Sequence, residues 1–95
     1  MPTEETSLKS AVKELLAIKG IFSYPITQSL GSYPGLPDRV MHRNGRVEYL
    51  EIKRPKGKLS PGQLAFQEQC EQDGIPYYVI RNIDDLLAVI NITGD

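Results

Sequence analysis

The sequence predicts one α/β domain over residues 1–95, with its elements in the order αβββαβα. Three observations lead to this fold class. Apolar residues recur at a helical period near the N-terminus, Asn44-Gly45 separates two segments with strand character, and Ser60-Pro61 opens a helical segment that is followed by β-branched and aromatic residues. With 40% hydrophobic residues among 95, the chain can fill one core but not two.

A first helix is expected between Thr3 and Gly20. Thr3 suits the N-cap, Glu4 and Glu5 in the first turn favour the helix dipole, and Gly20 suits the position after the last turn. Apolar residues fall at i, i+4, i+7 and i+8 on one face, namely Leu8, Val12, Leu15 and Leu16. The helix should therefore pack this face on the core.

Residues 21–28 are expected to form an edge strand, because Pro25 removes a donor from the ladder. Residues 29–37 hold two glycines and two prolines, which predicts a loop leading into Asp38. Asn44-Gly45 is a strong hairpin signal, so residues 39–43 and 46–53 should be antiparallel strands.

The two-residue turn also predicts the register of this hairpin. Arg43 should face Arg46, and continuing the same pairing places Asp38 opposite Glu51. Directly opposed carboxylates repel each other, so a purely structural sheet would avoid them unless a cation lay between them. Lys53, two residues beyond Glu51, should lie on the same sheet face.

The second half begins with a helix, in which Ser60 is the N-cap, Pro61 the first helical residue and Gly74 the stop. Residues 76–80 predict a buried strand. A last helix should start at Asn82, with Asp84 and Asp85 in its first turn, and run through Leu86, Leu87 and Ile90.

The opposed acids predict a magnesium or manganese site, since Asp38, Glu51 and the backbone carbonyl of Ile52 offer only oxygen ligands. A metal and Lys53 would together neutralise a phosphodiester and activate a water molecule. Zinc is not expected, because Cys70 is the single cysteine. Cys70 is instead expected in the core.

Charge is segregated along the chain although the net charge is only −1. Residues 39–58 hold seven Lys or Arg against two acids, a balance of +5, and residues 59–95 hold one Arg against six acids, a balance of −5. The basic stretch indicates a phosphate-binding face, although a solvated basic hairpin is the alternative. The candidates for DNA contacts are Arg54, Lys56, Lys58 and Arg39, with Arg43 and Arg46 less clearly assigned.

Two aromatic residues add less to this picture. Tyr33 lies in the loop before Asp38, where it is expected either to stack on an unpaired base or to pack on the sheet edge. His42 is the single histidine and is expected at the surface rather than as a catalytic base.

The run Gly35-Leu36-Pro37-Asp38, followed by Glu51-Ile52-Lys53, resembles the signature of the PD-(D/E)xK nucleases. Together with the helix start at residues 59–63 and the strand at residues 74–80, the pattern resembles the VRR-NUC subfamily, the virus-type replication and repair nucleases. The resemblance implies a restriction-endonuclease-like core with a mixed sheet flanked by helices. It also implies magnesium- or manganese-dependent DNA cleavage, and a stand-alone phage-type member acting on branched DNA.

Site residues carry over from the resemblance position by position. Asp38 and Glu51 would be metal ligands, Lys53 the catalytic lysine, and Gln63 the glutamine on the helix after the hairpin. An acid on the first helix usually completes the metal site, and Glu5 fits that spacing better than Glu4. Arg54 stands where members often have glycine, which leaves the approach of this loop to DNA open.

The expected function is a metal-dependent DNA endonuclease, preferably a homodimeric four-way junction resolvase. A flap or fork endonuclease, a non-catalytic DNA-binding module, and an RNase or a subunit of a restriction-like assembly are the alternatives. The acidic start and the absence of a long apolar run predict neither a signal peptide nor a membrane span. The expected location is the cytoplasm, that of a bacterial host if the chain is phage-encoded.

Overall fold

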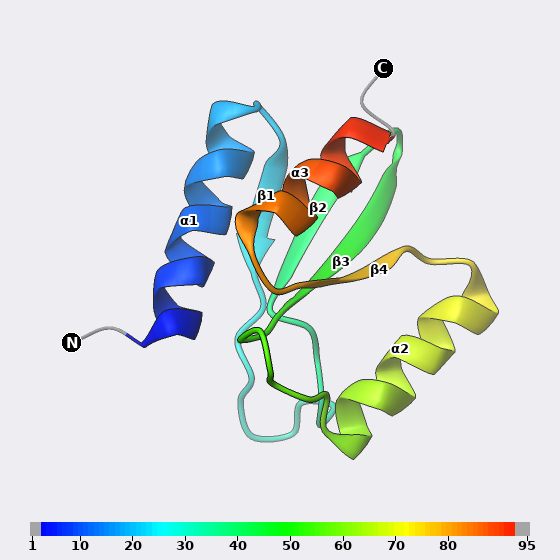
Figure 1. Cartoon of the computed structure of the whole chain (residues 1–95). Coiled ribbons are helices and arrows are strands. Elements are labelled where there is room, and N and C mark those ends of the chain that lie inside the picture. Colours follow the sequence, from blue (N-terminus) through cyan, green and yellow to red (C-terminus); the bar gives the residue numbers. More distant parts are fainter. Residues whose placement is uncertain (1–2, 93–95) are drawn as a thin grey trace.

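The computed structural model describes residues 3–92 and has the predicted order of elements (Figure 1). The elements are α1 (Glu4–Ile18), β1 (Phe22–Pro25), β2 (Arg39–Arg43), β3 (Arg46–Ile52), α2 (Pro61–Asp73), β4 (Tyr77–Ile80) and α3 (Ile83–Ile92). In this part of the chain no helix is both long and apolar enough to cross a membrane.

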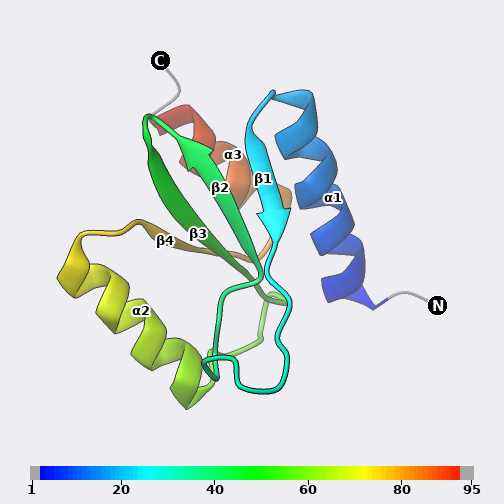
Figure 2. The same ribbon diagram turned by 180° about the vertical axis from the view of Figure 1, so that it is seen from behind.

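The four strands form one mixed sheet in the order β1-β2-β3-β4. β1, β2 and β3 pair antiparallel, and β4 pairs parallel with β3. Helices α1 and α3 cover one face, where they bury the core cluster of Val12, Leu16, Met41, Leu50, Ile52, Ile80, Leu86 and Ile90. Helix α2 covers part of the other face, and it lies apart from α1 and α3 when the molecule is seen from either side (Figures 1 and 2).

The helix ends follow the sequence signals. The Thr3 hydroxyl accepts a hydrogen bond from the Thr6 amide at 3.0 Å, as expected of an N-cap. Ser60 and Gln63 form a reciprocal capping box at the start of α2, with Pro61 at the first helical position. Both helices are therefore fixed at the ends that approach the candidate site.

The hairpin register is confirmed from Arg43 opposite Arg46 to Val40 opposite Tyr49. Asn44 and Gly45 both have positive φ values, 54° and 75°, which a two-residue hairpin turn of this kind requires. The strands β2 and β3 therefore present their residues to the two faces as the alternation predicted.

Three strand predictions were too long. The predicted strand 21–28 covers only Phe22–Pro25, because beyond the proline the chain turns away after one further bond, from the Ile26 amide to the Asp38 carbonyl. The predicted strand 46–53 ends at Ile52. The predicted buried strand 76–80 is Tyr77–Ile80 and only Ile80 is buried, because β4 lies at the edge of the sheet.

The loop before β2 rests directly on the first turn of α2. A Cβ atom added to Gly35 would lie 2.3 Å from the Gly62 carbonyl carbon, and one added to Gly62 would lie 2.8 Å from the Pro34 oxygen. Only glycine permits backbones to approach this closely. The contact brings the segment that carries Asp38 against the helix that carries Gln63.

Candidate metal and catalytic site

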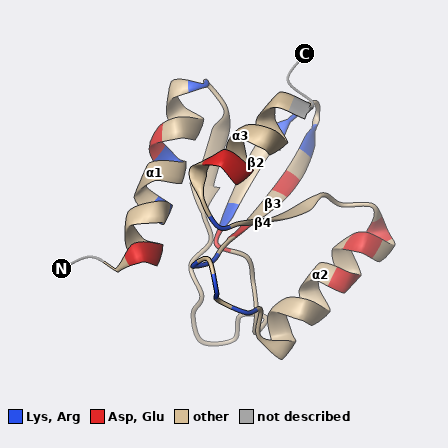
Figure 3. Cartoon of the chain, viewed as in Figure 1, with Lys and Arg blue, Asp and Glu red and all other residues tan. Residues whose placement is uncertain are grey.

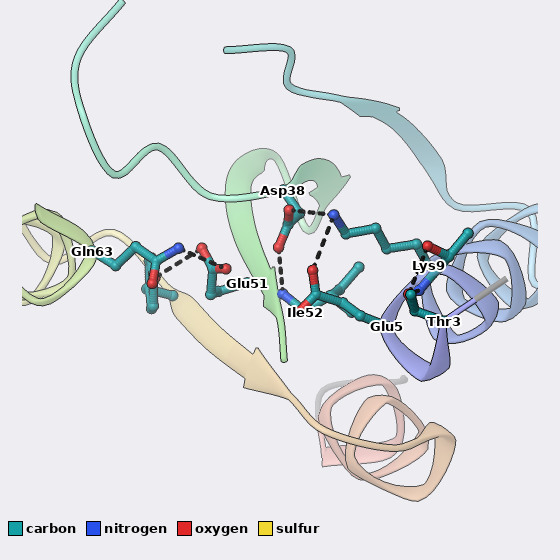
Figure 4. A network of polar contacts seen from close by, with 9 residues as sticks. Thr3, Glu5, Lys9, Asp38, Glu51, Ile52 and Gln63 are labelled. Atoms are coloured by element: carbon teal, nitrogen blue, oxygen red, sulfur yellow. Dashed lines mark hydrogen bonds and ion pairs between the residues drawn. The ribbon is translucent and has the colours of Figure 1, made fainter. Parts of the chain in front are cut away.

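Asp38 lies immediately before β2, one residue beyond the last pair of the hairpin, Arg39 with Leu50, so the predicted pairing of Asp38 with Glu51 is not part of the register. Its amide donates to the Leu50 carbonyl at 3.0 Å, and its Oδ2 atom accepts the Ile52 amide at 2.7 Å. Asp38 is thus tied to β3 twice, by its main-chain amide and by its carboxylate. Figure 4 shows Asp38 between Glu51 and Gln63 on one side and Lys9 and Glu5 on the other.

Glu51 is a buried acid, with 2% of its surface exposed. The Gln63 Nε2 atom donates to its Oε2 atom at 3.3 Å, and the Tyr77 hydroxyl donates to Oε1 at 3.5 Å. Burial, a hydrogen bond to Asp38 and the charge of Asp38 raise the pKa of Glu51 to about 8, against the opposing effect of Lys53. A nearby cation would be needed to keep this carboxylate ionised at neutral pH.

Gln63 makes two contacts through one side-chain amide group. Its Oε1 atom accepts the Ser60 amide at 2.8 Å, which caps α2, while its Nε2 atom holds Glu51. The amide group is therefore fixed at both ends. Tyr77, which the sequence analysis did not select, adds a second donor from β4 to the same carboxyl group.

Lys53 follows the last residue of β3, and its amide donates to the Ile80 carbonyl at 3.0 Å. Its positive charge favours ionisation of Glu51. Within residues 3–92 its ammonium group forms no ion pair with an acid. A cation beside the two acids thus remains available to an anionic substrate.

Glu5 does not join the two acids as expected, because Lys9 lies between them. The Lys9 Nζ atom is 3.2 Å from Asp38 Oδ1 and 3.5 Å from Glu5 Oε2. Among the described residues no three His, Cys, Asp or Glu side chains gather as a group that could hold a metal ion. Lys9 was not predicted as a site residue, although its spacing of four residues from Glu5 places the two on one helix face.

The remaining donors nevertheless suit a hard divalent cation. Asp38, Glu51 and the Ile52 carbonyl provide only oxygen, which magnesium and manganese prefer. The buried Glu51 carboxyl group has a strongly raised pKa, so a cation would favour its ionised form. A hollow of about 160 Å³ beside Asp38 is lined by Lys9, Pro25, Ile26, Asp38, Arg39 and Ile52.

The basic loop after β3 is held in place by one arginine from the end of β4. The Arg81 Nη1 atom donates to the carbonyls of Arg54, Pro55 and Gly57 at 2.9, 3.3 and 2.6 Å. Figure 3 shows basic residues along this loop and acidic residues on α2 and at the start of α3. A hollow of about 430 Å³ is lined by the loop and Glu4.

The hairpin arginines contact other residues of the protein, whereas the sequence predicted them on a phosphate-binding face. Arg43 pairs with the fully buried Glu48 at 2.6 Å, and Arg46 approaches the same carboxylate at 3.5 Å. Arg39 donates from Nε to the Ser23 hydroxyl at 3.0 Å. Much of the hairpin's positive charge is therefore used to neutralise a buried acid, which the sequence alone did not reveal.

The two aromatic candidates lie in different surroundings. The Tyr33 ring packs against Phe66 of α2, with ring centroids 5.8 Å apart, and about half of it remains exposed. His42 is exposed and contacts the rings of Phe22 and Tyr24 at 4.9 and 5.9 Å. Cys70 is buried, as expected.

Comparison with known proteins decides the family. The model of the VRR-NUC domain matches residues 3–82 of the sequence. The chain belongs to the VRR-NUC family. A solved structure described as a VRR_NUC domain superposes with a TM-score of 0.80 and 22% identity, covering 94% of this chain and 96% of that one.

The VRR-NUC assignment confirms the resemblance drawn from Asp38, Glu51-Ile52-Lys53 and their surroundings, and it gives the chain a nuclease-type fold. The structural match also confirms the predicted α/β class, a mixed sheet flanked by helices that is consistent with a PD-(D/E)xK-like core. At 22% identity the likeness concerns the fold alone. No curated protein matches the sequence.

Proposed function

We propose that this VRR-NUC domain is a magnesium- or manganese-dependent deoxyribonuclease that hydrolyses phosphodiester bonds. One observation carries the proposal. The buried Glu51 lies beside Asp38 at the end of a hairpin, near Lys53, whose ammonium group pairs with no acid among residues 3–92. Two acids and a lysine in this arrangement offer a metal position and a separate positive charge for a phosphate.

In this proposal Asp38, Glu51 and the Ile52 carbonyl hold the metal. When bound, the metal supplies positive charge to the phosphate and lowers the pKa of a water molecule. The Ile52 amide fixes Asp38 Oδ2, so that Oδ1, which faces Lys9 in this structure, is the oxygen that would bind the metal. Lys53 stabilises negative charge that develops on a phosphate oxygen or holds a proton from the attacking water.

Other residues position the acids and the DNA. Gln63 and Tyr77 orient the Glu51 carboxyl group from α2 and β4. Arg54, Lys56 and Lys58 belong to the basic loop that Arg81 holds. In this proposal they contact phosphates of the DNA backbone. The half-exposed Tyr33 and the partly covered Arg39 are assigned secondary contacts with DNA in this proposal.

We further propose branched DNA as the substrate, with a homodimer that resolves four-way junctions. The face covered in part by α2 leaves apolar rings exposed over β1 and β2, in Phe22 (63%) and Tyr24 (43%). An apolar surface of this kind suits a protein interface. A symmetric dimer would present two active sites to opposed strands, whereas a monomer would favour a flap or fork substrate.

The test is cleavage of labelled four-way junction, flap, linear duplex and single-stranded DNA with magnesium or manganese. We expect cleavage only with metal, and loss of at least about a hundredfold in rate in Lys53→Ala. Lys13→Ala is the matched control, since Lys13 is an exposed lysine of α1 without an ion pair in the described residues. Binding without cleavage under all these conditions would replace the enzyme with a DNA-binding module.

A further inference from the structure

Lys9 occupies the one oxygen of Asp38 that the backbone leaves open. Asp38 Oδ2 is taken by the Ile52 amide at 2.7 Å, and Lys9 Nζ lies 3.2 Å from Oδ1. A metal bound to Asp38 would use that same oxygen. Burial alone would lower the pKa of Lys9, but contacts with Asp38 and Glu5 more than offset this and raise it, so the group stays charged.

We propose that Lys9 is a built-in competitor of the metal, a positioning residue that neutralises Asp38 until a divalent ion displaces it. The proposal rests on the metal site of the proposed function. An ammonium group and a divalent ion at one carboxylate oxygen repel each other strongly, so the two cations cannot contact Asp38 Oδ1 at the same time. Lys9 thereby sets the ion concentration at which the site fills.

The structure permits such a displacement without moving α1. Val12 and Leu16 of α1 are fully buried, and Thr3 caps its first turn, so the backbone at Lys9 is fixed. The Lys9 side chain is 45% exposed and ends on a flexible stem, which allows the ammonium group to move to solvent. Glu5 on the same face can retain it nearby.

The experiment measures binding of Mn²⁺ to the full chain by titration calorimetry, without DNA, for the parent protein, Lys9→Met and Lys13→Met. Lys9→Met keeps the length of the side chain and removes its charge. We expect it to bind Mn²⁺ more tightly, on the order of tenfold. Lys13→Met makes the same change in net charge one turn along α1 and should stay within about twofold of the parent protein. Lys9→Arg, which keeps the charge, should bind no more tightly than the parent protein.

The possible outcomes separate this inference from the proposed function. Equal or weaker Mn²⁺ binding by Lys9→Met, with normal binding by the parent protein, would overturn the competition and leave the metal site standing. Absence of Mn²⁺ binding in the parent protein and in Lys9→Met would remove both. Binding by Lys9→Met but not by the parent protein would support the competition in its strongest form. Thermal unfolding of each variant checks that the fold is retained.

Discussion

Among single residues, Glu51 is the acid whose protonation the fold changes most. Its carboxyl group is buried, lies close enough to Asp38 to feel its charge, and accepts hydrogen bonds from the neutral donors of Gln63 and Tyr77. Burial and the neighbouring Asp38 favour the protonated form and outweigh these donors, so the pKa of Glu51 rises from an ordinary 4.5 to about 8. A group with a raised pKa stabilises the folded chain while it is protonated, and it loses that contribution when it ionises.

The stability of the metal-free protein should therefore depend on pH in a defined window. The contribution of Glu51 is fully present below pH 4.5 and is lost as the pH rises through about 8. We expect the free energy of unfolding to fall between these values by no more than about 5 kcal/mol. Urea unfolding in the presence of a chelator, at several pH values, measures the fall.

Glu51→Gln should flatten this pH dependence, because a neutral amide replaces the titrating carboxyl group. Glu68→Gln is the matched control, since Glu68 is an exposed acid on α2 and should leave the slope as it is. A Glu51→Gln protein that keeps the full slope would assign the titration to a different group.

The sequence predicted the acids of the candidate site better than it predicted which cations pair with acids in the fold. A two-residue turn and strand alternation suffice to place Asp38 at the start of β2 and Glu51 near the end of the neighbouring β3, because both are local rules. Lys9 reaches Asp38 only through the packing of α1 on the sheet, and the pairing of Arg43 with buried Glu48 depends on which sheet face is covered. Neither relation is encoded in spacing along the chain.

At the scale of elements, the site depends on how the loop before β2 meets α2. The contact between Gly35 and Gly62 joins these segments backbone to backbone. It brings together two residues of the candidate site that are 25 positions apart, Asp38 and Gln63. Signals at the start of α2, Ser60-Pro61, predicted the helix correctly, but nothing in the sequence predicted what its first turn would touch.

Gly62→Ala should disturb the site without changing a charged residue. Its new Cβ atom would lie 2.8 Å from the Pro34 oxygen, so the loop and the helix must separate. We expect a loss of about 1–3 kcal/mol in unfolding free energy, together with weaker Mn²⁺ binding as Gln63 moves off Glu51. Gly57→Ala is the control, because its Cβ atom would meet neighbours at ordinary distances of 3.4 Å or more. Equal stability of the two variants would show that the close approach is not required.

Arg81 makes a second connection between elements, from the end of β4 to the basic loop. Replacing Arg81 with Met removes three hydrogen bonds to loop carbonyls, so the loop should become mobile and lose its phosphate contacts. We expect duplex DNA affinity in the absence of metal to fall on the order of tenfold, with a shallower salt dependence. Fluorescence anisotropy at several salt concentrations measures both quantities.

Arg81→Lys separates positioning by Arg81 from a direct contact with DNA. A lysine keeps the charge but cannot donate to three carbonyls from one planar group, so it should rescue the affinity only in part. Complete rescue by Arg81→Lys would indicate that Arg81 contacts phosphate itself.

For the whole molecule, the helices cover the two faces of the sheet unequally. α1 and α3 close one face, whereas α2 covers the other mainly over β3 and β4. Phe22, Tyr24 and His42 therefore form a cluster of exposed rings over β1 and β2. That one domain spans the whole chain stays a prediction, as does the dimer that this surface would suit.

If this surface forms the dimer, polar substitution there should produce monomers. Phe22→Ser combined with Tyr24→Ser should halve the mass measured by light scattering after size exclusion, with the fold retained in circular dichroism. Leu30→Ser is the control, because Leu30 is a fully exposed apolar residue in the loop after β1. A parent protein that is already monomeric would favour the flap or fork substrate over the junction.

The side-chain amide group of Gln63 forms hydrogen bonds both to the start of α2 and to the buried Glu51. Its oxygen secures the first turn of α2, and its nitrogen secures Glu51. Whatever changes the bonding of Glu51 is therefore transmitted through Gln63 to the first turn of α2. Fraying of α2 at Ser60 and loss of the Gln63 bond to Glu51 should therefore occur together. The local order of this helix end would then report on the state of the candidate site.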